Sequence, residues 1–245
     1  MDIKKDKAVE GVGWENDAGH TKTYRDGKQE YVEKMGLELG VMFYELWQDL
    51  VRIHRCWGEL IVLFGTNKRV ELLNSVSPNF FKLIHDILWE YTILGLARIT
   101  DGAQTGCGKK VKKNLSIKAM KRLLSPEAIE VSDSIFSKVE KSVEFCRDWR
   151  NKHIAHRDLY YILQSPKQLK ATRKEVEATM SDIAAVMNAV AQCYQVPPTM
   201  FDFCIGADST SLLSYLDIGR RCSDERWKRL KNGLATPADY KLHSI

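Results

Sequence analysis

The chain has 245 residues, of which 44% are hydrophobic and 28% are charged, which is enough apolar sequence for one large domain or two small ones and excludes a disordered chain. With only 15 glycines and 6 prolines, collagen-like and low-complexity classes are also excluded. The formal net charge of +5 permits a nucleic acid partner without requiring one.

Six cysteines are spread along the chain, and no two of them form a Cys-x-x-Cys pair. This spacing argues against a zinc site, and we predict neither a metal nor a cofactor. A long chain without a secretory leader favours free thiols in a reducing compartment, so we expect a cytoplasmic protein. The longest uncharged stretch, residues 183–201, contains three amide side chains and two prolines, so no transmembrane segment is predicted.

The polar residues 1–30 lack sustained periodicity, and we expect them to form a flexible arm. Over residues 31–64, apolar side chains recur at steps of three and four, which predicts one long amphipathic helix. Ser77 and Pro78 predict the start of a second helix, which ends near residue 101. Residues 102–113 are rich in glycine and lysine and are expected to form a loop.

The second half of the chain continues the helical pattern. Asn114 or Ser116 is predicted to cap a short helix, and Ser125 to open a third long helix that runs into residues 147–153. A fourth long helix is predicted over residues 172–194, and two shorter ones over 209–216 and 223–231. No segment alternates with period two as strands require. We therefore predict an all-α antiparallel bundle over residues 31–195 with a helical extension over 196–245.

The glycine-rich loop does not match a phosphate-binding P-loop. Ala103 stands where the first glycine of that motif belongs, and Lys110 stands where its serine or threonine belongs. Between Lys109 and Arg122, seven cations and no acids occur in fourteen residues. This run either binds RNA phosphates or is a solvated basic loop, and the sequence leaves both interpretations open.

The most informative segment is 150–158, which reads Arg-Asn-Lys-His-Ile-Ala-His-Arg-Asp. Arginine offers a fixed fork of donors for a phosphate, histidine titrates near neutral pH, and asparagine can hold a hydroxyl or phosphate oxygen. No carboxylate or histidine cluster with metal-like spacing accompanies them, which favours a metal-independent reaction. In the structural alternative, His153 and His156 stabilise the end of the third helix through its dipole.

Helical geometry makes dimerisation a prediction. In a straight α-helix, His156 lies about 9 Å along the axis and about 120° around it from Arg150, so one chain would not aim both at a single phosphate. A two-fold dimer that faces the motif against its own copy would bring Arg150, Asn151 and His156 of both chains to one cleft. We therefore expect a homodimer.

Other polar and aromatic residues have simpler interpretations. Arg98 and Asp101 are predicted to pair with the motif region, for example Arg98 with Asp158, or to form an ordinary surface ion pair. Cys146 is expected to be buried packing rather than a nucleophile. Four tryptophans at helical spacing are expected in the core: Trp47, Trp57, Trp89 and Trp149.

The segment beginning at Arg150 resembles the hallmark of the HEPN superfamily, in which an arginine and a polar residue precede a histidine after four to six intervening positions. Five residues separate Arg150 from His156. The longer form, Arg-Asn-Lys-x-x-Ala-His-x-Asp, resembles the abortive-infection AbiU-like branch. Further resemblance lies in Leu72-Leu73-Asn74, Phe80-Phe81, residues 94–101 and Asn114-Leu115-Ser116.

This resemblance implies an antiparallel helical bundle of HEPN type with additional C-terminal helices. It also implies a dimeric, metal-independent endoribonuclease of a phage-defence or toxin–antitoxin system. In that role Arg150 would steady the scissile phosphate and Asn151 would help to position it. His156 would act as general base or acid while a ribose 2′-hydroxyl attacks, leaving a cyclic phosphate.

The implied supporting residues are His153, Asp158 and Arg98, and the implied RNA-binding residues are Lys109, Lys110, Lys112, Lys113, Lys152 and Arg157. The expected partners are RNA, a second copy of the chain, and an antitoxin or nucleotidyltransferase, with no membrane. The alternative is a non-catalytic HEPN-like module that binds RNA, a nucleotide or a protein.

Overall fold

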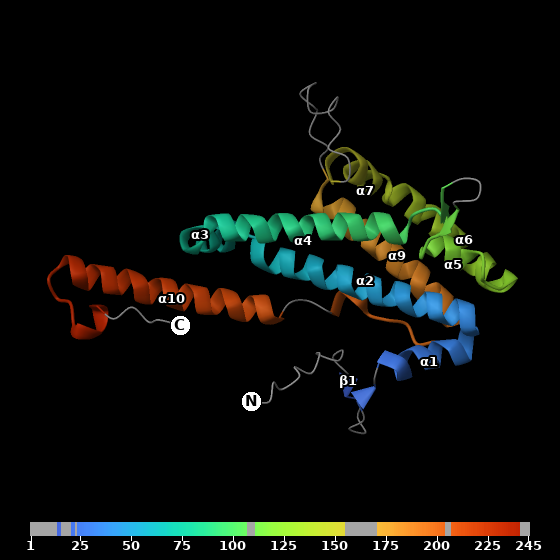
Figure 1. Ribbon diagram of the computed structural model, residues 1–245, viewed down its shortest axis with the longest axis horizontal. Coiled ribbons are helices and arrows are strands. Elements are labelled where there is room, and N and C mark those ends of the chain that lie inside the picture. Colours follow the sequence, from blue (N-terminus) through green and yellow to red (C-terminus); the bar gives the residue numbers. More distant parts are fainter. Residues whose placement is uncertain are drawn as a thin grey trace, which may run out of the picture. The chain divides into compact units, whose positions relative to one another are not determined.

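The computed structural model describes residues 14–15, 21–22, 24–106, 111–154, 171–203 and 207–240. These residues are almost all helical, which confirms the all-α prediction (Figure 1). The α-helices are α1 (Tyr24–Met35), α2 (Leu37–Phe64), α3 (Asn67–Val76), α4 (Pro78–Ile99), α5 (Ile117–Lys121), α6 (Pro126–Ser142), α7 (Glu144–Trp149), α9 (Arg173–Cys193) and α10 (Ala207–Lys231).

Other element types are short. A π-helix, η2 (Arg150–Ile154), follows α7, and two 3₁₀ turns are η3 (Phe201–Phe203) and η4 (Pro237–Tyr240). Two antiparallel two-residue ladders pair β1 (Trp14–Glu15) with β2 (Thr21–Lys22) and β3 (Gln104–Thr105) with β4 (Lys112–Lys113). The predicted loop over residues 102–113 therefore contains a small β-hairpin.

The chain divides into two compact units, and the division runs through α2 and α4. The first unit comprises residues 1–51 and 93–201, and the second comprises residues 52–92 and 202–245. In the first unit α6 packs along α9, and in the second α3 packs along α10. No helix among the described residues is long and apolar enough to cross a membrane.

The first predicted helix is two helices, and it begins at Tyr24 rather than Tyr31. Gly36 separates α1 from α2 with a backbone φ of +82°, a value that glycine adopts at no steric cost. The chain then turns so sharply that a Cβ on Gly40 would lie 2.5 Å from the carbonyl oxygen of Tyr31. Glycine at position 40 thus permits the close approach of α1 and α2.

The helix α3 lies where the sequence analysis predicted no element. Thr66 caps it by accepting a hydrogen bond from the backbone N–H of Arg69. Its single fully buried side chain, Leu73, joins a core cluster of the second unit together with Leu63, Phe81 and Leu213. One apolar anchor in ten residues is too few to give a helical period, although the packed core stabilises the helix.

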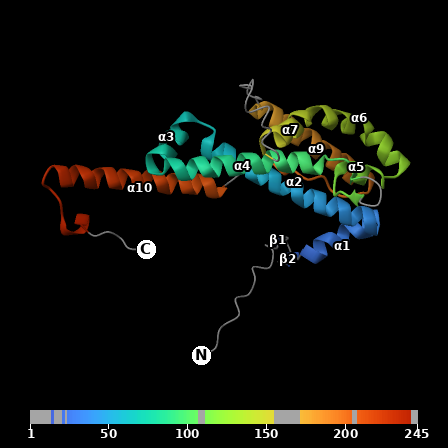
Figure 2. The same ribbon diagram turned by 45° about the horizontal axis from the view of Figure 1, so that its top comes forward.

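The predicted starts of three helices in the first unit are confirmed by their caps. Ser116 caps α5, Ser125 caps α6 with Pro126 at the first helical position, and Thr172 caps α9 through a reciprocal capping box with Glu175. These side chains satisfy N–H groups that the first helical turn leaves without partners. The helices α6 and α9 pack along each other (Figure 2), and each of them buries several side chains.

The third predicted helix does not run straight into the motif. It ends at Ser142, and after a turn at Val143 the chain continues as α7 and then as η2, which contains the first five residues of the motif. The Thr179 hydroxyl donates to the Ser142 carbonyl at 2.6 Å, so α9 satisfies an acceptor at the end of α6. The rotation of about 120° between Arg150 and His156 assumed an α-helix and does not apply to a π-helix, whose hydrogen bonds join residues five apart.

The two short helices predicted over 209–216 and 223–231 are one continuous helix, α10. Gly219 lies within it with nothing within 4 Å of its would-be Cβ, and a helical glycine costs only about 1 kcal/mol. Asp217 pairs with Arg220 at 3.3 Å and with Arg221 at 2.5 Å, so two ion pairs about one turn long bridge the glycine.

The prediction for the tryptophans is correct only in part. Trp57 is buried, whereas Trp47, Trp89 and Trp149 are partly exposed. The indole N–H of Trp47 donates to the Thr199 hydroxyl at 2.8 Å, which explains why this ring lies at the edge of the core.

Candidate phosphate-binding site

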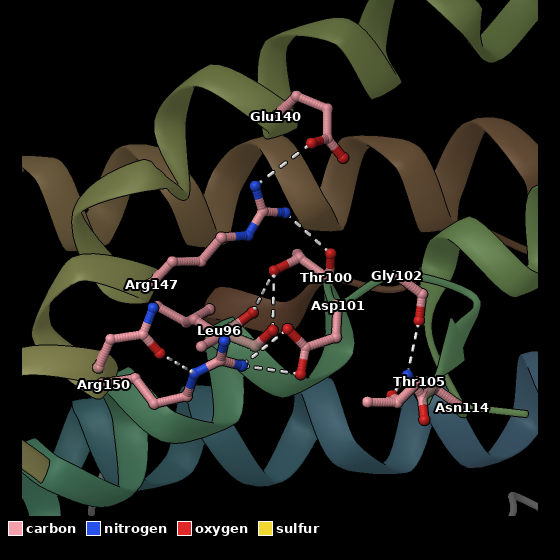
Figure 3. Close-up of polar contacts among 11 residues, drawn as sticks. Leu96, Thr100, Asp101, Gly102, Thr105, Asn114, Glu140, Arg147 and Arg150 are labelled. Atoms are coloured by element: carbon pink, nitrogen blue, oxygen red, sulfur yellow. Dashed lines mark hydrogen bonds and ion pairs between the residues drawn. The ribbon is translucent and has the colours of Figure 1, made fainter. Parts of the chain in front are cut away.

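Arg150 lies at the junction of α7 and η2, where its guanidinium faces Asp101, just past the end of α4 (Figure 3). Its Nη1 donates to both carboxylate oxygens of Asp101, at 2.7 and 2.8 Å. The two side chains are 27% and 33% exposed, so the pair is partly shielded but open to a ligand. The predicted catalytic arginine is therefore held in one orientation by an acid 49 residues earlier in the sequence.

Asn151 holds a second edge of the same guanidinium. Its Oδ1 accepts a hydrogen bond from Arg150 Nε at 3.1 Å. Because Nε–H is a donor, the oxygen of the Asn151 amide must face Arg150 and the amide nitrogen must face away from it. No described residue accepts from Arg150 Nη2 or from the Asn151 amide nitrogen. The two neighbouring residues thus retain uncommitted N–H donors, the groups that bind phosphate oxygens.

Arg147 braces the end of α4 on which Asp101 lies. Its Nη2 donates to the carbonyl oxygen of Thr100 at 2.9 Å, and its Nη1 contacts Glu140 at 3.3 Å. The buried Thr100 hydroxyl donates to the Leu96 carbonyl at 2.7 Å. Figure 3 shows Arg147 reaching from α7 to both partners. The carboxylate that holds Arg150 is therefore attached to a backbone fixed by several hydrogen bonds.

The β3–β4 hairpin begins directly after Asp101. The Asn114 side chain closes its base by donating to the Gly102 carbonyl at 2.8 Å and to the Thr105 hydroxyl at 2.5 Å (Figure 3). Lys112 and Lys113 are exposed on β4. Their side chains make no ion pair with any described residue, so both are available to a polyanion. Lys109 and Lys110 lie outside the described residues.

Later cations of the basic run are engaged within the protein. Lys118 contacts Glu140 at 2.9 Å, and Lys121 contacts Asp133 at 2.5 Å. The basic run therefore divides into two groups. Lys112 and Lys113 of the hairpin face solvent, whereas Lys118 and Lys121 form ion pairs with acids of α6.

Arg98 pairs with Asp49 of α2 at 3.0 Å. The example partner of Arg98, Asp158, lies outside the described residues, whereas Asp101 pairs with the motif as predicted, through Arg150. Asp158, His156 and Arg157 lie outside the described residues, as does the side chain of His153. Lys152 contacts Asp148 one turn earlier at 2.8 Å.

Cys146, one turn before Arg150, is fully buried, and burial raises the pKa of its thiol to about 12. Its burial agrees with the prediction that Cys146 is a packing residue. Among the residues that the structure describes, no three His, Cys, Asp or Glu side chains gather as a metal site would require. Within the described part of the motif, the polar groups nearest Asp101 are the guanidinium of Arg150 and the amide of Asn151.

Arg150 and Asn151 were predicted as catalytic residues, whereas Asp101 was predicted only to pair with the motif region, with no role in the site. The useful signal was the position of this acid, one residue after Thr100 at the end of an apolar helix. The family model described as AbiU2, of HEPN type, matches residues 36–211, and no curated protein or solved structure shows a significant match.

Proposed function

Because the chain belongs to the HEPN AbiU2 family, we propose that it is a metal-independent endoribonuclease. One observation carries the proposal: Arg150 and Asn151 present uncommitted donors side by side, with their remaining polar atoms already engaged. Two N–H groups at one place suit the non-bridging oxygens of a phosphodiester. The exposed lysines of the neighbouring hairpin supply further positive charge for an RNA backbone.

In the proposed reaction, the ribose 2′-oxygen attacks the adjacent phosphorus while the bond from phosphorus to the 5′-oxygen breaks. His156 either accepts the proton of the 2′-hydroxyl or gives a proton to the departing 5′-oxygen, and solvent water makes the other proton transfer. Arg150 and Asn151 stabilise the charge that develops on the non-bridging oxygens. The products are a 2′,3′-cyclic phosphate and a 5′-hydroxyl. His153 and Asp158 are proposed to support His156.

The η2 segment favours a functional role for this region. π-Helical turns are rare and often occur at functional sites, because they re-aim side chains that an α-helix would direct elsewhere. The motif begins at the first residue of this turn. We propose that two copies of the chain face their η2 segments toward each other, so that His156 of one copy completes the site.

The proposed setting is phage defence or a toxin–antitoxin pair, with an antitoxin or a nucleotidyltransferase as partner. A second candidate is a non-catalytic module that binds RNA or a nucleotide, because the uncommitted donors of Arg150 and Asn151 suit a bound phosphate equally well. A phosphate held by Arg150, Asn151 and the hairpin lysines needs no general base. The presence or absence of turnover distinguishes the two candidates.

The test is cleavage of structured and unstructured RNA by purified protein in the presence of a chelator. Arg150→Ala and His156→Ala are expected to abolish cleavage. Matched controls are Arg173→Ala, which removes an arginine from a surface pair on α9, and His85→Ala on α4, and both should cleave as the wild type does. Cleavage that survives both motif substitutions would refute the proposal. RNA binding without cleavage by the wild type would support the second candidate.

A further inference from the structure

Asp101 lies on a rigid part of the first unit. Its backbone N–H donates to the Arg98 carbonyl at 3.2 Å, and the preceding residue, Thr100, is fully buried. The Thr100 carbonyl accepts from Arg147, and its hydroxyl donates to the carbonyl oxygens of α4. The carboxylate of Asp101 is therefore anchored independently of Arg150, which is a requirement for one side chain to orient another.

The contacts of Arg150 specify which of its donors remain. A guanidinium carries five N–H groups. Nη1 faces the two oxygens of Asp101, and Nε faces Asn151. The two N–H groups of Nη2 are left, and the carboxylate determines where they point. Without Asp101, the long arginine side chain would lose this constraint and sample several rotamers.

We propose that Asp101 is the positioning residue that aims Arg150 Nη2 at a phosphodiester, an inference that rests on the proposed function. Asp101 itself repels phosphate, because it carries negative charge close to the place where the phosphate binds. The same carboxylate therefore raises turnover by orienting Arg150 and weakens ground-state binding of RNA. A residue with a merely structural role would not produce these two opposite effects.

The test compares Asp101→Asn with the wild type. Misplacement of a catalytic group by about 1 Å costs on the order of 100-fold in rate, so kcat should fall about 10- to 100-fold. Removing one charge about 6 Å from a phosphate at high dielectric should tighten binding of an RNA with a 2′-deoxy cleavage site about threefold at low salt. Asp101→Glu keeps the charge but lengthens the side chain, so it should lower kcat without tightening binding.

Asp133→Asn is the matched control. It removes the same charge from an ion pair on α6, and Asp133 lies nine residues before the end of that helix. The two ion pairs have no residue in common, since Asp133 contacts Lys121 and Asp101 contacts Arg150. Its turnover and RNA affinity should equal those of the wild type.

The orientation of Arg150 can also be tested without measuring turnover, through the NMR resonance of its Nε–H group. This resonance is assigned by its loss in Arg150→Lys. It should be sharp in the wild type and broadened or lost in Asp101→Asn. If Asp101→Asn keeps the wild-type kcat, the inference about Asp101 is wrong, although the proposed function still stands. The same holds if this variant loses turnover and RNA binding together while the Arg150 resonance stays unchanged. If the wild-type protein leaves RNA intact, the proposed function is wrong. The inference about Asp101 is then tested by two measurements on Asp101→Asn, the Arg150 resonance, which should broaden, and RNA binding, which should tighten.

Discussion

Replacing Arg147 by methionine is expected to destabilise the first unit through the end of α4. The substitution keeps an unbranched side chain but removes the hydrogen bond to the Thr100 carbonyl and the ion pair with Glu140. Leaving a buried acceptor without its partner costs about 1–3 kcal/mol. A partly exposed ion pair contributes at most about 1 kcal/mol. The free energy of unfolding should therefore fall by about 2–3 kcal/mol.

Thermal unfolding followed by circular dichroism measures this loss. For a chain of this length, the expected change corresponds to a Tm lower by about 4–12 °C. Glu140→Gln is the control, because it removes the ion pair and also the contact of Glu140 with Lys118 at 2.9 Å but keeps the bond to Thr100. It should cost less than about 1 kcal/mol. Equal losses in the two variants would refute the role assigned to the Thr100 carbonyl.

Three other predictions concern different parts of the chain. Gly40→Ala should lower the free energy of unfolding by about 1–3 kcal/mol because its Cβ would overlap the backbone of α1, and an unchanged Tm would contradict that packing. Hydrogen bonds from Arg229 hold the pKa of the Asp239 carboxyl below its usual range, so its stabilisation is present above about pH 4 and lost as the pH falls further. The Tm difference between wild type and Asp239→Asn should shrink on acidification, and a constant difference would argue against this pair. Iodoacetamide should modify the exposed Cys193 but not the buried Cys146 in the native protein, as peptide mass spectrometry can show.

Helix boundaries marked by side-chain chemistry were predictable, because a cap acts on the N–H groups next to it. Ser125 and Thr172 are examples, and each lies where the pattern placed it. The break at Gly36 was not predictable from periodicity, since apolar residues continue on both sides of it. The length of α10 was underestimated because Gly219 resembles a helix end, although the ion pairs of Asp217 with Arg220 and Arg221 cross it and support a continuous helix.

In the candidate site too, features set by neighbouring residues were predictable, whereas features set by tertiary packing were not. Arg150 and Asn151 were selected because their chemistry is contained in a short motif. For Asp101 the sequence predicted a pairing with the motif region but not its partner, because Arg150 lies 49 residues away and the packing of the two helix ends decides which side chains meet. The π-helical form of residues 150–154 likewise has no sequence period of its own, so an α-helix was the natural expectation.

The chemistry of the product ends tests the central claim most directly. The wild-type protein should cleave a short RNA in the presence of EDTA, and mass spectrometry of the fragments should find a 2′,3′-cyclic phosphate on one and a 5′-hydroxyl on the other. A single 2′-deoxynucleotide at the cleavage site should block the reaction, because the attacking oxygen is then absent. Fragments that carry a 5′-phosphate, or cleavage that tolerates the 2′-deoxynucleotide, would contradict the account.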